Sequence, residues 1–544
     1  MLKTILSQNN SITIHTLVDL IHECYKTMQK IIKILFLLIF VLFSIIFMLK
    51  INPNNYELGQ DSAVFLYTAN EMIEGGAPYI DSWDHKGPFI YFLNELAILI
   101  HPSTLWGLFY LLTFLLASSI LFLFWILSKD IPLTAISAGF LIFLLTENKV
   151  LYGNRTELFT SFFLMISIAL FLIGKKKKKP LPFGFIGVLF AIVFLMRPNN
   201  TIYWVVLLIS LLIECFQNKK ITKNIIFFTF GAIVPIAVSL IYLVQKKALS
   251  DFFEQFFHYN FFYSSGTHNP FLMGISLCNN LTNSFGIPLL IIIFSGFILS
   301  AFLLEEIKVD TIDNSEIFSC YKILAISFPI ELLFSSLSGR ENPYYLGILP
   351  VYFMMIIIFV INYLIGKWRK HLHIGIFSSS VMLFCFILLF GATTQNQLNI
   401  IKDNWSKIYN LSFFKQTYIS PETKFIIENS DQNDTILVWG AAAQYYVTSG
   451  RKSPTRYTYM FPLTQCDFVT KEMWQEFVSG VKERKPKLIL ETSNYGLPTG
   501  EKPYYIGCEH VEDSIEEFLT YISENYELKS LESPHIKTVY SLIE

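Results

Sequence analysis

A series of apolar runs, each near the length of a helix that crosses a bilayer, constrains the fold of this chain more than any other feature. Backbone groups inside a bilayer find no water, so such runs must form helices that satisfy their own hydrogen bonds. Only 15% of the residues are charged, whereas a soluble protein would carry about 25%. We therefore predict a mainly α, polytopic membrane protein with about eleven transmembrane helices. The predicted spans are 31–49, 105–127, 131–146, 158–174, 180–196, 201–216, 225–244, 285–304, 323–337, 345–365 and 374–390.

Basic residues set the predicted orientation of these spans. With the N-terminus in the cytosol, the inner loops carry most of the Lys and Arg of the membrane part, including the consecutive lysines at 175–179. The tail after the last span is then extracytoplasmic. The formal net charge is -1, and no soluble segment has a concentrated basic patch, which argues against a nucleic-acid partner.

Polar segments rich in charged and aromatic residues connect several of the predicted spans. In the orientation above, almost all of those that precede the tail face outward. The longest, residues 50–104, lies between the first two spans, and a loop of that length is more often functional than a mere connector. Acids placed beside a bilayer usually have a function there. The other outward segments are 147–157, 197–200, 245–284 and 338–344.

The tail of the chain differs in composition from the rest. Charged residues and turn formers increase after residue 392, and no run of membrane length remains. We predict a membrane module at 1–392, with its functional outer loop at 50–104, and an extracytoplasmic α/β domain at 393–544. Short apolar runs bounded by turn residues predict strands in this domain. Strands are expected at 435–440 and 486–491, and helices at 441–450 and 513–526.

The cysteines carry little information about function. Seven are present, and they form no CxxC pair and no metal-type cluster. Cys466 and Cys508 both fall in the tail, where an extracytoplasmic location would allow them to form a disulfide. Two free thiols are an equal alternative.

The loop at 50–104 contains the first candidate site residues. Asp61 stands at the start of a helix-like stretch, where a helix cap or first-turn carboxylate is the alternative to a catalytic role. Asp84, His85 and Lys86 stand side by side further along the loop. Such a cluster can bind a metal, hold a phosphate through the lysine ammonium, or form a solvated turn.

Further candidates stand at the outer ends of other spans. Glu157 begins the fourth span, where a helix-dipole role is the alternative and Arg155 is a candidate ion-pair partner. Arg197 follows the fifth span, and anchoring at lipid headgroups is an equally good explanation for it. Arg340 follows the ninth span, and Tyr345 comes shortly after it, at a depth where tyrosines usually form an interfacial belt.

Taken together, these segments resemble a known family. DSAVFLYTANEMIEGGAPYIDSWDHKGPFIYFL, which begins at Asp61, resembles the first extracytoplasmic loop of the protein-mannosyltransferase and aminoarabinose-transferase type of membrane glycosyltransferases, the GT-C superfamily. NRTE, MRPN and GRENPYYLGILP resemble the family's second acidic loop, its basic step after the fifth span, and its basic-plus-tyrosine element. VWGAAAQYYVTSGRKSPTRYTYMFPL resembles the outer domain of bacterial members. The resemblance covers most of the chain and implies a GT-C-like fold in a bacterial plasma membrane, with the endoplasmic reticulum as the alternative.

The resemblance also implies an activity. It is that of an inverting glycosyltransferase, which takes a sugar from a polyprenyl-phosphate donor and passes it to a glycan, lipid or protein acceptor outside the cytosol. Asp61 would be the catalytic base, and Glu157, across the cavity, would position the acceptor or a metal. The residues that hold the departing phosphate would be Lys86, Arg197 and Arg340. Further substrate contacts would come from Asp84, His85 and Tyr345.

Two positions depart from the family pattern. His85 stands where some relatives have a carboxylate that helps to bind a metal. A divalent metal held by His85 and Asp84 is therefore an option for this chain and not a requirement. Val64 stands where the aminoarabinose-transferase branch has an arginine, so that specificity is not assigned.

Two other classes of protein stay open as alternatives. A related enzyme could keep the fold and transfer a phospho-sugar or a whole oligosaccharide, or polymerise glycan repeats. A transporter or flippase for lipid-linked glycans would be expected to show internal repeats and polar groups near the midplane of the membrane. The sequence shows no such repeat, and Glu331, inside the ninth span, is the one residue that favours a transporter.

Overall fold

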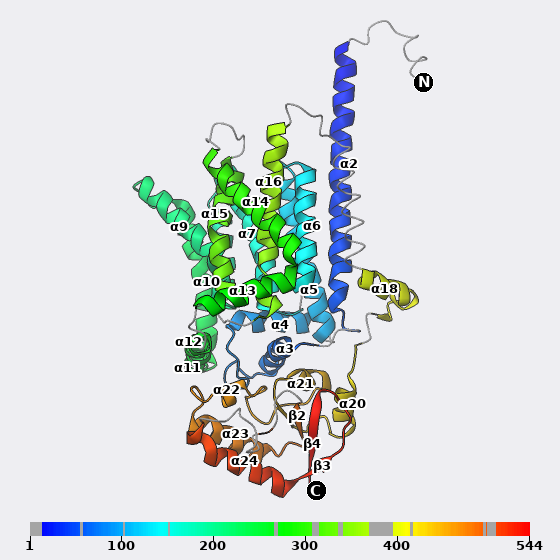
Figure 1. Cartoon of the computed structure of the whole chain (residues 1–544), viewed down its shortest axis with the longest axis vertical. Helices are drawn as coiled ribbons and strands as arrows, with labels where there is room; N and C mark the ends of the chain where they lie inside the picture. The colour runs from blue at the N-terminus through cyan, green and yellow to red at the C-terminus, as the bar shows by residue number, and fades with distance from the viewer. Residues whose placement is uncertain are drawn as a thin grey trace.

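The computed structural model places a helical bundle at one end of the molecule and a smaller part with a β-sheet at the other (Figure 1). Within the described residues, eight helices are long and apolar enough to cross a membrane, or nine if one bent pair counts as a single span. The chain is therefore a mainly α, polytopic membrane protein with a C-terminal α/β domain, as predicted. The structure describes residues 14–54, 58–101, 104–150, 153–265, 270–306, 315–335, 341–368, 395–413, 417–492, 497 and 508–543.

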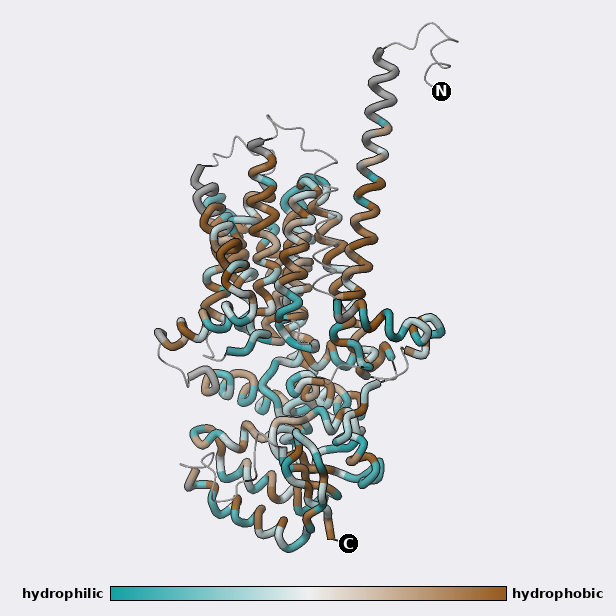
Figure 2. Tube along the Cα trace, turned by 45° about the vertical axis from the view of Figure 1, so that its right-hand side comes forward, coloured by the Kyte–Doolittle hydropathy of each residue, from teal (hydrophilic) through white to brown (hydrophobic). Residues whose placement is uncertain are grey.

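Apolar helices form the bundle, and hydrophobic residues run along most of their length (Figure 2). α7 is the most enclosed of the long helices, and its first turn contributes to the site described below. The helices are α2 (Ile14–Met48), α5 (Thr104–Leu127), α6 (Leu133–Val150), α7 (Thr156–Lys177), α8 (Leu181–Phe194), α9 (Ile202–Gln217), α10 (Lys223–Gln245), α13 (Pro270–Phe285), α14 (Ile287–Glu306), α15 (Ser315–Ser335) and α16 (Leu349–Trp368). Short 3-10 turns at their ends are η1 (Leu49–Ile51), η2 (Pro198–Thr201) and η5 (Pro343–Leu346).

Two of the predicted spans differ from straight membrane-crossing helices. The run at 180–196 forms α8, whose 14 residues are fewer than the roughly 20 that a straight span needs. The run at 285–304 becomes α14, which is bent by 110° relative to α13. Gly286 stands at this bend with a φ of 78°, a conformation that a residue without a Cβ adopts easily. The run at 374–390 lies outside the described residues.

The long outward segments, predicted as loops, are largely helical. The predicted helix that begins at Asp61 is present, but the second helix of the same segment was not anticipated. Figure 1 shows both helices lying between the bundle and the C-terminal domain. They are α3 (Gln60–Ile73) and α4 (Pro88–Ile100). The segment 245–284 also folds into helices before and including most of α13, namely α11 (Leu249–Phe252), the π-helix η3 (Phe253–His258) and α12 (Tyr259–Ser265).

The C-terminal domain contains a four-stranded sheet in the order β1-β2-β4-β3. β1 and β2 are parallel, whereas β4 runs antiparallel to both of its neighbours. Both predicted strands and both predicted helices are present, and β3 and β4 are additional. The strands are β1 (Ile436–Trp439), β2 (Leu488–Thr492), β3 (Tyr526–Lys529) and β4 (Ile536–Leu542). After the bundle, α18 (Gln395–Asp403) contacts α2 and η1, and α19 (Trp405–Tyr409) follows it. The helices of the domain are α20 (Pro421–Glu428), α21 (Gln444–Ser449), α22 (Phe461–Thr464), α23 (Lys471–Arg484), η8 (Glu509–Val511) and α24 (Glu512–Asn525).

A compact aromatic core holds this domain together. Trp439 of β1 stacks on Phe518 of α24, with ring centroids 5.5 Å apart, and lies 5.9 Å from Trp474 of α23. All three side chains are fully buried. Cys466 and Cys508 form a disulfide that links the segment after α22 to the start of η8. The sheet is thus covered by helices whose aromatic residues supply much of its hydrophobic stabilisation.

The C-terminal domain docks directly on the segment 50–104. The backbone N–H of Trp83 donates to the carbonyl of Arg456 over 2.8 Å. The guanidinium of Arg456 forms ion pairs of 2.9 Å with Asp251 of α11 and with Glu476 of α23. Arg456 therefore ties together the outer loop, the helices after α10 and the C-terminal domain.

Candidate active site

A cavity of about 180 Å³ lies where α3, the starts of α7 and η5, the end of α8 and the C-terminal domain meet. Its lining combines acids, bases and aromatic residues from segments far apart in the sequence. The lining residues are Gln60, Asp61, Val64, Phe65, Asp84, His85, Lys86, Arg155, Thr156, Glu157, Arg197, Asn342, Tyr344, Tyr345, Tyr459 and Phe461. Seven of the eight predicted site residues therefore share one cavity. Arg340 lies outside the described residues, so its role stays a prediction.

The first carboxylate of the cavity is Asp61, in the first turn of α3. Its Oδ2 forms an ion pair with the guanidinium of Arg155, which is the N-cap residue of α7. Arg155 also lies over the ring of Tyr344, 4.2 Å from its centroid. The side chain of Asp61 is 37% exposed, against 12% for Arg155, so the carboxylate is accessible from the cavity.

The second carboxylate is Glu157, in the first turn of α7. It is 3% exposed and forms an ion pair with Arg197, which follows α8. The hydroxyl of Thr156 donates to its Oε2 over 2.9 Å. Arg197 lies over the ring of Tyr345, 4.7 Å from the centroid, so each arginine of the cavity pairs with an acid and stacks on a tyrosine of η5.

The suggested pairing of Arg155 with Glu157 is wrong. Residues two positions apart at a helix start point in different directions and do not face each other. Arg155 therefore reaches across to Asp61, and Glu157 reaches across to Arg197. The two ion pairs join α7 to α3 on one side and to the end of α8 on the other, which fixes the spacing of the two carboxylates.

A buried amide network lies beside the ion pair of Asp61. The hydroxyl of Ser62 donates to the carbonyl of Asn154 over 2.8 Å, and the amide of Asn154 donates to the side-chain oxygen of Asn94 over 2.6 Å. All three side chains are buried, so the hydrogen bonds are shielded from water. The network connects α3, α4 and the start of α7, and it holds the backbone of Asp61 next to that of Arg155.

Asp84 is buried and fixes the loop that carries Lys86. Its Oδ2 accepts a hydrogen bond of 2.9 Å from the hydroxyl of Tyr91, and its Oδ1 accepts from the backbone N–H of His85 and from the hydroxyl of Tyr459. Burial raises the pKa of Asp84, against the opposing effects of Lys86 and of these hydrogen bonds. Both oxygens of this carboxylate are thus engaged by the protein itself.

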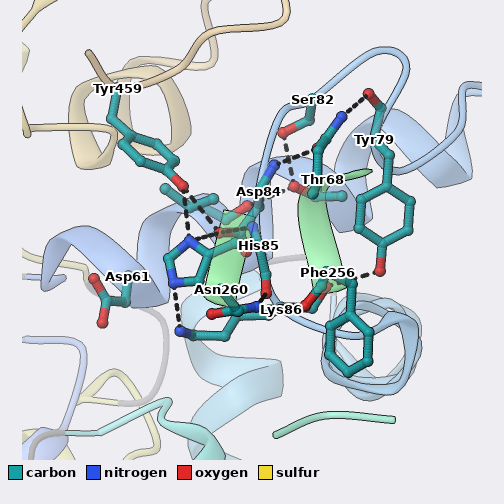
Figure 3. Close-up of polar contacts among 12 residues, drawn as sticks. Asp61, Thr68, Tyr79, Ser82, Asp84, His85, Lys86, Phe256, Asn260 and Tyr459 are labelled. Carbon is teal, nitrogen blue, oxygen red and sulfur yellow. Dashed lines mark hydrogen bonds and ion pairs between the residues drawn. The ribbon is translucent and has the colours of Figure 1, made fainter. Parts of the chain in front are cut away.

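The side chain of Lys86 is held by its neighbour in the sequence. Nζ of Lys86 lies 2.7 Å from Nε2 of His85, and Nδ1 of His85 lies 3.3 Å from the hydroxyl of Tyr459 (Figure 3). The backbone here is fixed as well, because Asn260 donates to the carbonyl of His85 and Tyr79 donates to that of Lys86. Both the side chain and the backbone of Lys86 are therefore held by hydrogen bonds.

Gly87 stands where the loop of Lys86 packs against the segment after α8. Its N–H donates to the carbonyl of Met196 at the end of α8, and a Cβ at this position would overlap the carbonyl of Leu195. A proline would bring that Cβ and would also lack the N–H. Glycine thus lets the loop of Lys86 lie directly against the segment that carries Arg197.

Some residues that line the cavity were not identified as candidates from the sequence. One residue that was noted there, Glu331, does not line the cavity. Tyr459 and Phe461 line the cavity from the C-terminal domain. With 28 tyrosines and 52 phenylalanines in the chain, neither had a distinguishing signal. Glu331 is instead fully buried on α15.

The donor atoms of the cavity do not fit a divalent cation. The oxygens of Asp84 already accept three hydrogen bonds, and the ammonium of Lys86 lies against His85, where its charge opposes a second cation. Asp61 and Glu157 each face an arginine. In the part of the chain that the structure describes, no group of three or more His, Cys, Asp or Glu could hold a metal ion. The residues of the cavity are therefore assigned roles that need no metal.

Comparison with solved structures finds chains that are similar to this one. No protein-family model matches the sequence, and no curated protein matches it. The apo form of the oligosaccharyltransferase of Archaeoglobus fulgidus is similar, with a TM-score of 0.44 and 14% identity, over 93% of this chain and 74% of that chain. A likeness at this level establishes neither a family nor an activity, so the function has to be argued from the cavity.

Proposed function

We propose that this chain is an inverting glycosyltransferase of the GT-C superfamily that takes a sugar from a polyprenyl-phosphate donor on the extracytoplasmic face of a membrane. One observation carries the proposal. A single cavity of a membrane-embedded protein brings the carboxylates of Asp61 and Glu157 together with the cations Lys86 and Arg197. Inverting transfer from a phosphate needs both kinds of group in one place.

The carboxylate activates the acceptor in this proposal. Asp61 takes the proton from the acceptor hydroxyl as that oxygen attacks the anomeric carbon of the sugar. The bond between the anomeric carbon and the phosphate oxygen breaks, and its electron pair stays on the phosphate. Because Arg155 engages Oδ2 of Asp61, we assign Oδ1 to the acceptor hydroxyl. Glu157, which is held by Arg197, is the positioning acid.

The cations stabilise the leaving group. Negative charge grows on the phosphate as the glycosidic bond breaks, and fixed positive groups lower the energy of that state without a proton donor. Lys86 and Arg197 supply such charge, with Arg155 as a third cation on the lining. Each of them is held by a hydrogen bond or ion pair within the protein, so little reorganisation is needed when the phosphate arrives.

Two observations support an extracytoplasmic site. Cys466 and Cys508 form a disulfide, and disulfides persist mainly in oxidising compartments outside the cytosol. The run of lysines at 175–179 closes α7 at the end opposite to the cavity, as the positive-inside rule expects for a cytosolic end. A bacterial plasma membrane is the proposed location.

The size and position of the cavity favour transfer of a single sugar over the alternatives. At about 180 Å³ it is smaller than the roughly 300–1,000 Å³ of typical ligand pockets. Its charged residues stand at helix ends next to the C-terminal domain, whereas a transporter site is expected near the membrane midplane within broken helices. The acceptor is proposed to be a lipid-linked glycan, an envelope polymer or a protein.

The experiment that tests this function is a donor panel. Purified protein in lipid nanodiscs is incubated with polyprenyl-phosphate sugars and candidate acceptor fractions, and the release of free polyprenyl phosphate is measured. We expect release from at least one donor that depends on an acceptor. No release from any donor by well-folded protein would reject the proposal, and release of a polyprenyl diphosphate from an oligosaccharide donor would favour the related enzyme.

A further inference from the structure

A chain of hydrogen bonds connects Lys86 to the C-terminal domain. An ammonium group has donors only, so Nζ of Lys86 donates to Nε2 of His85 over 2.7 Å. The proton of a neutral His85 is then on Nδ1, which faces the oxygen of Tyr459 at 3.3 Å. The hydroxyl of Tyr459 can in turn donate to Oδ1 of Asp84, 3.1 Å away. Figure 3 shows the hydroxyl of Tyr459 pointing toward His85 and Asp84.

The position of Tyr459 allows it to restrict the movement of the His85 and Lys86 side chains. It is 3% exposed, and its ring packs edge-on against Trp83 with centroids 5.8 Å apart. The next residue, Met460, donates its N–H to the carbonyl of Gly440, directly after β1. The backbone next to Tyr459 is thus anchored beside the sheet of the C-terminal domain, and its ring packs on the outer segment.

Lys86 needs such support if it is to bind a phosphate. A lysine ammonium sits on a flexible four-carbon stem, and holding it in one place costs side-chain entropy. A hydrogen bond to a ring that is itself fixed removes part of that cost before the ligand arrives. Without the Tyr459 hydroxyl, the ring of His85 would lose one of the contacts that orient it toward Lys86.

We propose that Tyr459 is a positioning residue that holds the His85–Lys86 pair toward the donor phosphate, so that the C-terminal domain takes part in donor binding. This inference rests on the proposed function, because it assigns a phosphate to Lys86. Among the contacts described above, Tyr459 reaches Lys86 through His85. The effect of Tyr459 on phosphate binding therefore requires Lys86. A general structural role would not depend on that lysine.

The test is a double-mutant cycle read by binding. Tyr459→Phe removes the hydroxyl and keeps the ring against Trp83, and Lys86→Gln removes the cation. Binding of polyprenyl phosphate to protein in nanodiscs is measured for the wild type, both single variants and the double variant. We expect Tyr459→Phe to weaken binding about tenfold, the loss typical of one hydrogen bond to a charged group. In the Lys86→Gln background the same change should have almost no further effect.

Matched controls and a second readout make the outcome decisive. Tyr540→Phe removes a hydroxyl from the same domain, on β4 and away from the cavity, and should bind like the wild type. With donor and acceptor present, Tyr459→Phe should raise the KM for the donor more than it lowers kcat, with an unchanged Tm. If Tyr459→Phe does lower the Tm, His85→Ala interrupts the same chain and should reproduce the binding loss.

Two results would contradict the role of Tyr459, and a third would contradict the proposed function. Wild-type affinity in Tyr459→Phe would overturn the inference, as would a tenfold loss that persists in the Lys86→Gln background. Absence of binding by the wild type, with folded protein, would reject the proposed function on which the inference rests.

Discussion

Replacing Asp61 by asparagine is expected to lower the rate of sugar transfer by about 10²- to 10⁴-fold, the usual contribution of a general base. Asparagine keeps the size and polarity of the side chain but cannot accept the acceptor proton. Asp61 is 37% exposed to the cavity, so the substitution should leave the Tm close to that of the wild type. The measurement is single-turnover transfer with saturating donor, together with thermal unfolding of the same preparation.

Asp81→Asn is the matched control for this experiment. Asp81 belongs to the same outer segment, but it does not line the cavity, and its carboxylate accepts only a local hydrogen bond from the N–H of Ala77 among the contacts described. The same chemical change there should leave the transfer rate within about twofold of the wild type. If Asp61→Asn transferred sugar as fast as this control, Asp61 could not be the base.

Replacing Arg197 by methionine is expected to destabilise the protein by about 3–5 kcal/mol, because it leaves the carboxylate of Glu157 buried without its partner. The side chains of Glu157 and Arg197 are 3% and 15% exposed. Adding Glu157→Gln in the same chain removes the uncompensated charge and should restore most of the lost stability. The double variant still lacks the cation that stabilises the leaving phosphate, so transfer should stay lost.

The surface ion pair of Lys176 and Asp130 serves as the control for this prediction. Its atoms are 2.6 Å apart, but the lysine is 51% exposed. Such a pair contributes about 0–1 kcal/mol, so Lys176→Met should shift the Tm little. Thermal unfolding in nanodiscs compares all four proteins. If Arg197→Met and Lys176→Met shifted the Tm equally, the ion pair of Arg197 and Glu157 would not contribute the stability predicted for it.

Much of the fold could be predicted because a bilayer leaves the chain few options. Hydropathy alone located most of the spans, since an apolar run of sufficient length has to be helical in a membrane. It could not show that the run at 180–196 stops short of a full span, or that a glycine bends the run at 285–304. Those outcomes depend on packing against neighbouring helices and on one backbone angle.

The members of the site could be predicted better than their contacts. Asp61 and Lys86 stand in the outer loop 50–104, and Glu157 and Arg197 stand at the outer ends of spans. Their common side of the membrane already suggests that they meet. Which arginine faces which acid depends on how the helix ends approach each other in space. The local pairing of Arg155 with Glu157 was therefore wrong, although both residues do line the cavity.

The contribution of the C-terminal domain to the cavity could not be predicted from sequence patterns. Tyr459 is separated from Asp84 by 375 positions and reaches it only because the domain docks on the outer segment. Nothing in the residues around it distinguishes it from the other tyrosines of the chain. The same holds for Gly87, whose role becomes clear only when the carbonyl of Leu195 is seen beside it.

The central claim is that this cavity holds the phosphate of a lipid-linked sugar, and the most direct test is an experimental structure of the protein in nanodiscs with bound polyprenyl phosphate. We predict density for the phosphate in the cavity, within charge-assisted hydrogen-bond distance, about 2.7–2.9 Å, of Lys86 and Arg197. A phosphate bound elsewhere, such as near Glu331 within the membrane, with the cavity unchanged, would contradict the account.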